Sequence, residues 1–215
     1  MVVLSDLVVV LLLLTNLRLL GSSRIVACIQ TVALQAVVLS VITLTSSLSN
    51  LTPAVVALTL STMAVKGLLL PWLLRRSVRG VGVGREVEPF VGFTTSVLIG
   101  GGLLGFSFLI SKPLLVSAPP GISAMLIPGA MFTILTGLFI VVSRRKALTQ
   151  VLGYLVLENG VYVFGSSLAV EEPLLVEMGI LLDVLVAVFV MGIVIFQINR
   201  EFDHIDTDKL SVLKD

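Results

Sequence analysis

The chain has 215 residues, of which 57% are hydrophobic and only 13% are charged, and its net charge is +1. Soluble domains carry about 25% charged residues, so this chain is too poor in charge to cover a water-facing surface. The near-neutral charge excludes a general attraction to nucleic acid, and a single cysteine, Cys28, excludes an internal disulfide or an all-cysteine metal site. We therefore predict an integral membrane protein, with the lipid bilayer as its first partner.

Seven stretches of the chain are long and apolar enough to cross a membrane, which takes roughly 20 residues of helix. They cover residues 3–20, 25–46, 53–74, 90–110, 122–143, 148–169 and 174–198. The first stretch lacks a basic start and carries Asp6, so we interpret it as a retained span and not as a cleaved signal. The predicted fold class is an all-α, polytopic transmembrane bundle of about seven helices.

The charges between these stretches alternate between two sides. One side receives basic residues, namely Arg18, Arg24, Arg75, Arg76, Arg79, Arg85, Arg144, Arg145 and Lys146, followed by the C-terminal tail. The other side receives Lys112 and the acids Asp6, Glu171 and Glu172. Basic loops stay in the cytoplasm, so we predict an outer N-terminus, a cytoplasmic C-terminus and a multi-pass location in the cell inner (plasma) membrane.

Small residues gather in the fourth stretch, where "IGGGLLGF" contains Gly101 and Gly105 four positions apart. A small residue at every fourth position of a membrane helix is typical of close helix packing. We therefore expect this stretch to pack tightly against another helix.

Three ionisable residues, Lys66, Glu158 and Asp183, fall deep inside the predicted spans. Glu158 lies ~15 Å from the cytoplasmic end of its span and Asp183 ~14 Å from the outer end of the next one, at 1.5 Å per residue. A charge at this depth costs on the order of 3 kcal/mol, and such residues often mark ion pathways. This pattern favours a proton path through Glu158, Asp183 and Lys66 over the alternative of a buried pair that only fixes helix register.

Four further residues support or flank these groups. Tyr154 and Tyr162 stand at i−4 and i+4 from Glu158, on the same helix face, and Asn159 adds a neighbouring polar group. Glu177 lies near the outer edge of its span, where we expect it to be interfacial. Lys66 either snorkels toward the cytoplasm or pairs with Glu158 or Asp183.

No set of nucleophile, base and orienting residue is visible, and no metal cluster or dinucleotide motif occurs. We therefore expect no cofactor and no catalysis by this chain alone. Any redox chemistry would belong to partner subunits.

The last three stretches resemble subunit K of complex I, the NADH:quinone oxidoreductase, in "SRRKALTQVLGYLVLENG", "VEEP" and "VEMGILLDVLVAVFVMGIVIF". With "IDTDKL" and the extra N-terminal spans, the whole chain resembles component E of hydrogenase-4 and formate hydrogenlyase membrane arms. The resemblance implies a four-span region at 1–115 similar to subunit J, a three-span region similar to subunit K at 116–200, and a cytoplasmic tail at 201–215.

The resemblance also implies a function. The chain would be a non-catalytic membrane subunit of a redox-driven, ion-translocating oxidoreductase complex, with other membrane-arm subunits as its partners. Glu158 matches the first buried glutamate of subunit K, and Asp183 matches the second by position. The alternatives are a subunit of a multi-subunit cation/proton antiporter, a stand-alone secondary transporter, and a scaffold whose buried charges serve packing alone.

Overall fold

The computed structural model describes residues 2–46, 60, 63–81, 89–116 and 123–168, and these residues form helices and short connections without a strand. The helices are α1 (Val2–Gly21), α2 (Ile25–Ser46), the π-helical turn η2 (Val65–Leu69), α4 (Leu70–Val81), α5 (Phe93–Val116), α6 (Leu126–Ser143) and α7 (Ala147–Leu168). The all-α prediction is confirmed for these residues. The predicted seventh span, with Glu177 and Asp183, lies outside them.

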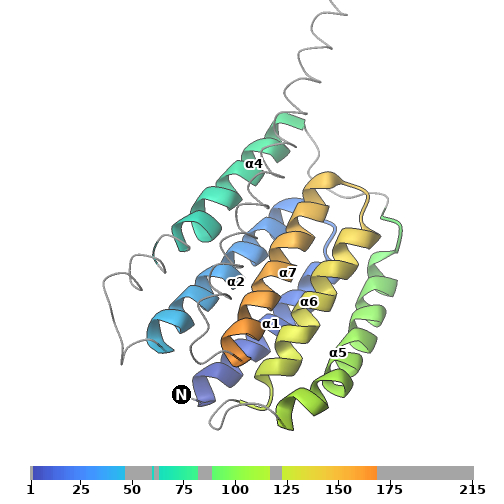
Figure 1. Cartoon of the computed structure of the whole chain (residues 1–215). Coiled ribbons are helices and arrows are strands. Elements are labelled where there is room, and N and C mark those ends of the chain that lie inside the picture. Colours follow the sequence, from blue (N-terminus) through green and yellow to red (C-terminus); the bar gives the residue numbers. More distant parts are fainter. Residues whose placement is uncertain (1, 47–59, 61–62, 82–88, 117–122, 169–215) are drawn as a thin grey trace, which may run out of the picture.

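Helices α1, α2, α6 and α7 form a bundle, with α5 along one edge and α4 at the opposite edge (Figure 1). At one end of the bundle, Nη2 of Arg144 donates to the backbone oxygen of Leu20 at 2.8 Å, which joins the ends of α6 and α1. At the other end, the hydroxyl of Ser123 donates to the carboxylate of Asp6. Helices α1 and α6 therefore run parallel.

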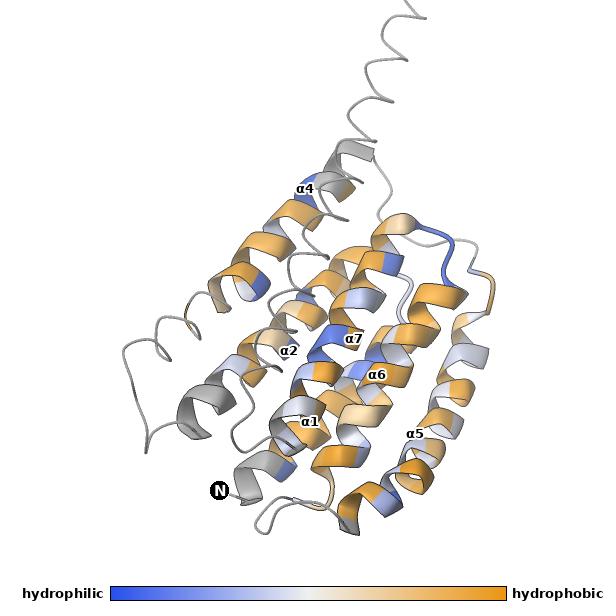
Figure 2. Cartoon of the chain, in the orientation of Figure 1, coloured by the Kyte–Doolittle hydropathy of each residue, from blue (hydrophilic) through white to orange (hydrophobic). Residues whose placement is uncertain are grey.

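Three of the described helices are long and apolar enough to cross a membrane, namely Phe93–Leu115, Leu126–Ser143 and Ala147–Gly165. Apolar colour dominates them in Figure 2, and the middle of α7 is a hydrophilic interruption. Such helices satisfy every backbone group internally, as a bilayer requires. The three helices agree with a membrane protein.

Two helices continue past the predicted ends of their apolar stretches. Helix α4 extends to Val81 although the stretch ended at residue 74, and α5 extends to Val116 although the stretch ended at residue 110. The basic residues that end the apolar pattern near residue 75 are good helix formers. Hydropathy therefore marked the end of the apolar segment and not the end of the helix.

The π-helical turn before α4 has a local cause in Pro71. Proline has no backbone N–H, and its ring clashes with the carbonyl of residue i−4 in a regular helix. The chain widens here, and the backbone N–H of Leu70 bonds to the oxygen of Val65, five residues back. Lys66 lies within this widened turn.

The tight glycine packing occurs between α6 and α7, not at the predicted pair in α5. A Cβ atom added at Gly153 would lie 2.9 Å from the backbone oxygen of Gly137, and one at Gly160 would lie 2.6 Å from the backbone nitrogen of Ile134. A Cβ atom at Gly101 or Gly105 would meet nothing within 4 Å. The spacing of Gly101 and Gly105 indicated a packing surface, but among the described residues the close glycine contacts between two helix backbones lie in α6 and α7.

Candidate functional site

The centre of the candidate site is a buried ion pair between η2 and α7. The ammonium of Lys66 contacts Oε1 of Glu158, and the two side chains are 10% and 3% exposed. The structure therefore brings together two of the three ionisable residues that the sequence placed inside spans. A buried pair of this kind offsets part of the desolvation cost of each charge.

This pair belongs to a polar layer that lies between two apolar clusters. Each of four helices places its polar residues between a buried residue of one cluster and a buried residue of the other. On α1, Thr15 and Asn16 fall between Leu12 and Leu19. On α2, Gln35 falls between Val32 and Leu39 in the same way.

The two helices that follow later in the chain repeat this order. On α6, Thr133 lies between Ala130 and Ile140. On α7, Glu158 and Asn159 lie between Val156 and Val163. These polar groups therefore occupy one level of the described helices, with an apolar cluster on each side.

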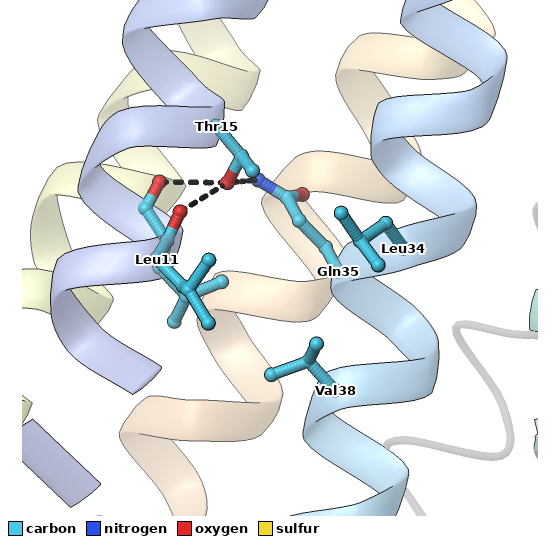
Figure 3. Close-up of a pocket in the computed structure, with 6 residues that line it drawn as sticks. Leu11, Thr15, Leu34, Gln35 and Val38 are labelled. Carbon is cyan, nitrogen blue, oxygen red and sulfur yellow. Dashed lines mark hydrogen bonds between the residues drawn. The ribbon is translucent and has the colours of Figure 1, made fainter. Parts of the chain in front are cut away.

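Hydrogen bonds link the uncharged members of the layer from α7 to α6. The amide of Asn159 donates to Oε1 of Gln35 at 3.5 Å, and Nε2 of Gln35 donates to Oδ1 of Asn16 at 2.9 Å. The amide of Asn16 donates to the hydroxyl of Thr133 at 2.9 Å. Nε2 of Gln35 also donates to the hydroxyl of Thr15 at 2.7 Å (Figure 3).

The layer combines one carboxylate, one ammonium and several neutral amides and hydroxyls. Only the carboxylate and the ammonium are titratable groups. Among the described residues, no three histidine, cysteine, aspartate or glutamate side chains gather in a group that holds a metal ion. The carboxylate of Glu158 is the group of this layer that is chemically able to accept a proton or another small cation.

The predicted supporting residues have different outcomes. Asn159 is 3% exposed and enters the hydrogen-bonded layer. Tyr154 packs against the larger apolar cluster, and Tyr162 is 38% exposed. The role of the two tyrosines beside Glu158 stays a prediction.

Sequence reasoning missed Asn16, Gln35 and Thr133. Asn16 in "LLLLTNLRLL" and Gln35 in "VALQAVVL" are polar residues inside apolar runs. Polar residues at membrane depth face the interior of a bundle, so this signal was present. It was overlooked because neither side chain carries a charge.

Arg144 lies in the basic connection between α6 and α7, as the charge pattern predicts, but its side chain is buried. It is 1% exposed, and besides Leu20 its guanidinium donates to the backbone oxygen of Val91 at 3.3 Å and the hydroxyl of Ser96 at 3.4 Å. It also lies 4.6 Å from the ring centre of Phe93. Arg144 therefore joins the ends of α1 and α6 to the start of α5.

Comparison with known proteins identifies relatives over most of the chain. The uncharacterized protein Rv0085 of Mycobacterium tuberculosis is 35% identical over 190 residues, which cover 88% of this chain and 86% of that protein. Hydrogenase-4 component E of Escherichia coli K12 is 29% identical over 154 residues, which cover 72% of this chain and 71% of that protein. The chain belongs to the family of Rv0085 and is similar to hydrogenase-4 component E.

The similarity to hydrogenase-4 component E confirms the resemblance to component E that the sequence motifs predicted. No family model matches the chain, and no solved structure matches it. The resemblance to subunit K and the link to formate hydrogenlyase stay predictions. Homology to a hydrogenase component, together with three apolar helices of spanning length, indicates a membrane protein.

Proposed function

We propose that the chain is a non-catalytic membrane subunit of a complex-I-like, redox-driven ion-translocating complex of the hydrogenase or formate hydrogenlyase type. In this proposal it contributes Glu158, Lys66 and Asp183 to a path for protons or sodium ions. The partners are the other membrane subunits of that complex. The complex lies in the cell inner membrane, and the end of the bundle with Arg144 faces the cytoplasm.

The observation that carries this proposal is the Lys66–Glu158 pair at the level of the polar layer. A bundle with a purely structural role would be at least as stable with apolar residues at these two positions, because replacing a buried ion pair by hydrophobic residues is often neutral or stabilising. A carboxylate beside an ammonium gives a site whose charge changes when one proton or cation arrives or leaves. Homology to a hydrogenase component supports the kind of complex in which such a site would act.

The complex itself is tested by purification in mild detergent through a tag on the C-terminus, followed by mass spectrometry. We expect iron–sulfur and hydrogenase-like or other dehydrogenase subunits to purify with the chain. Antiporter-type membrane subunits alone would contradict the redox-driven proposal. Recovery of the chain as a monomer would contradict membership of any such complex.

A further inference from the structure

The uncharged half of the polar layer has no role in the ion path proposed above. Asn16, Gln35 and Asn159 are 0%, 2% and 3% exposed. Amide side chains do not titrate near neutral pH, so they neither store nor release the ion. Their burial at the level of Glu158 calls for another role.

The direction of each hydrogen bond in this half is fixed by two threonines. The hydroxyl of Thr133 donates to the backbone oxygen of Gly129 at 2.8 Å, so it can only accept from the amide of Asn16. The hydroxyl of Thr15 donates to the backbone of its own helix, at 2.7 Å to Leu11, so it too accepts. Threonine in a helix commonly bonds to the carbonyl four residues earlier.

Because these two hydroxyls act as acceptors, each amide of this hydrogen-bonded series has one possible orientation. Since Asn16 presents its nitrogen to Thr133, its oxygen is turned toward Gln35. Gln35 must then present its nitrogen to Asn16 and Thr15, which turns its oxygen toward Asn159. The amide of Asn159 is therefore held as a donor to α2. Figure 3 shows the bond between Gln35 and Thr15. If any one of these three amides were flipped, two donors or two acceptors would face each other.

Helix α2 contacts both elements that carry the ion pair. Gln35 holds Asn159, the residue directly after Glu158 on α7. Two residues farther along α2, Val37 lies against η2, where a Cβ added to Gly67 would be 3.0 Å from its Cγ2 atom. Gly67 directly follows Lys66. One turn of α2 therefore contacts the residue that follows Lys66 and the residue that follows Glu158.

We propose that Gln35 is a positioning residue for the Lys66–Glu158 pair. Its hydrogen bond to Asn159 sets the rotation of α7 about its axis, and this rotation turns Glu158 toward Lys66. The inference rests on the proposed function for its consequence in ion movement, but its geometric part stands on the described contacts alone. An exchange site needs its side chain to be held within a fraction of an ångström by hydrogen bonds from the surrounding residues.

The direct test is infrared difference spectroscopy on the chain purified with the subunits that accompany it. The carboxyl bands of Glu158 are those that Glu158→Gln removes. We expect Gln35→Met, which keeps the length of the side chain and removes its hydrogen bonds, to shift these bands. Ser40→Ala is the matched control, because Ser40 is buried on the same helix and its hydroxyl, within the part of the chain that the structure describes, bonds only to the backbone oxygen of Ala36, at 2.9 Å. Unshifted bands in Gln35→Met would overturn the inference.

A second variant covers the case in which Gln35→Met does not assemble. Thr133→Val keeps the volume of the side chain and removes the hydroxyl that orients Asn16. We expect it to shift the Glu158 bands in the same direction as Gln35→Met. Bands that stay at their wild-type positions in an assembled Thr133→Val complex would also overturn the inference.

The number of ions moved per electron distinguishes a failure of this inference from a failure of the proposed function. We expect Gln35→Met to lower it by up to about tenfold, the equivalent of one hydrogen bond. We expect the double variant Gln35→Met/Glu158→Gln to be no worse than Glu158→Gln alone, because Gln35 acts through Glu158. Losses that multiply would overturn the positioning role. Shifted bands together with full pumping by Glu158→Gln would support the positioning role and contradict the proposed ion path.

Discussion

The ammonium of Lys66 and the carboxylate of Glu158 form an ion pair between the π-helical turn η2 and helix α7. The two residues are 92 positions apart in the sequence, and both side chains are almost completely buried. Each charge therefore depends on the other, since removal of one partner leaves an uncompensated charge. This dependence leads to a prediction about stability.

We predict that Lys66→Met destabilises the protein by about 3 kcal/mol, because the carboxylate of Glu158 loses its ammonium partner at membrane depth. The double variant Lys66→Met/Glu158→Gln should recover most of this loss, since neither position of the pair then carries a buried charge. The measurement is the thermal unfolding midpoint in detergent. A double variant that is less stable than Lys66→Met would contradict the interpretation.

We predict that Gly137→Ala weakens the α6–α7 contact, because the new Cβ would lie 2.7 Å from the backbone oxygen of Gly153, where backbone cannot easily move. Overpacking of this kind costs about 1–3 kcal/mol. Gly102→Ala is the matched control, since its Cβ meets nothing within 4 Å and gains about 1 kcal/mol of helix propensity. The two unfolding midpoints should move in opposite directions. Equal shifts of the two midpoints would contradict the proposed dependence of the α6–α7 contact on Gly137.

We predict that Arg144→Lys destabilises the protein by roughly 1–3 kcal/mol, because an ammonium cannot reach all the acceptors of a guanidinium and leaves a buried one unsatisfied. Arg76→Lys is the control, since Arg76 is exposed and lies 5.6 Å from the ring centre of Trp72. Thermal unfolding of both variants measures the difference. A control that loses as much stability as Arg144→Lys would contradict the role given to the buried guanidinium.

We predict that the end of the bundle with Arg144 faces the cytoplasm, because basic residues concentrate there. In a Cys28→Ser background, a cysteine replacing exposed Lys112 should react with an impermeant maleimide added to intact cells. A cysteine replacing exposed Ala147 should react only after the membrane is opened. The opposite pattern would invert the proposed orientation.

Much of the fold follows from apolar stretch length. The stretches at residues 3–20 and 25–46 agree with α1 and α2 within two residues, because a bilayer-length apolar run has few alternatives to a helix. The widened turn at Lys66 was not predicted. Pro71 disturbs a regular helix, but the sequence alone does not give the acceptor, five residues back, that the backbone N–H of Leu70 reaches.

The candidate site was predictable only in its charged part. Burying Glu158 and Lys66 carries a cost large enough to stand out in an apolar sequence. Gln35 and Asn16 carry a smaller cost, and their meaning arises from contacts between residues far apart in the sequence. The burial of Arg144 was not predicted, because local charge patterning does not show that three carbonyl or hydroxyl oxygens converge on its guanidinium.

The central claim is that Glu158 exchanges the translocated ion, and Glu158→Gln tests it most directly. The amide keeps the size of the side chain and removes the exchangeable charge. The measurement is the number of ions moved per electron pair by the assembled complex in proteoliposomes, at unchanged electron-transfer activity in detergent. The account predicts a loss of most ion movement with intact assembly. Full ion movement by an assembled Glu158→Gln complex would contradict it and leave the ion pair with a purely structural role.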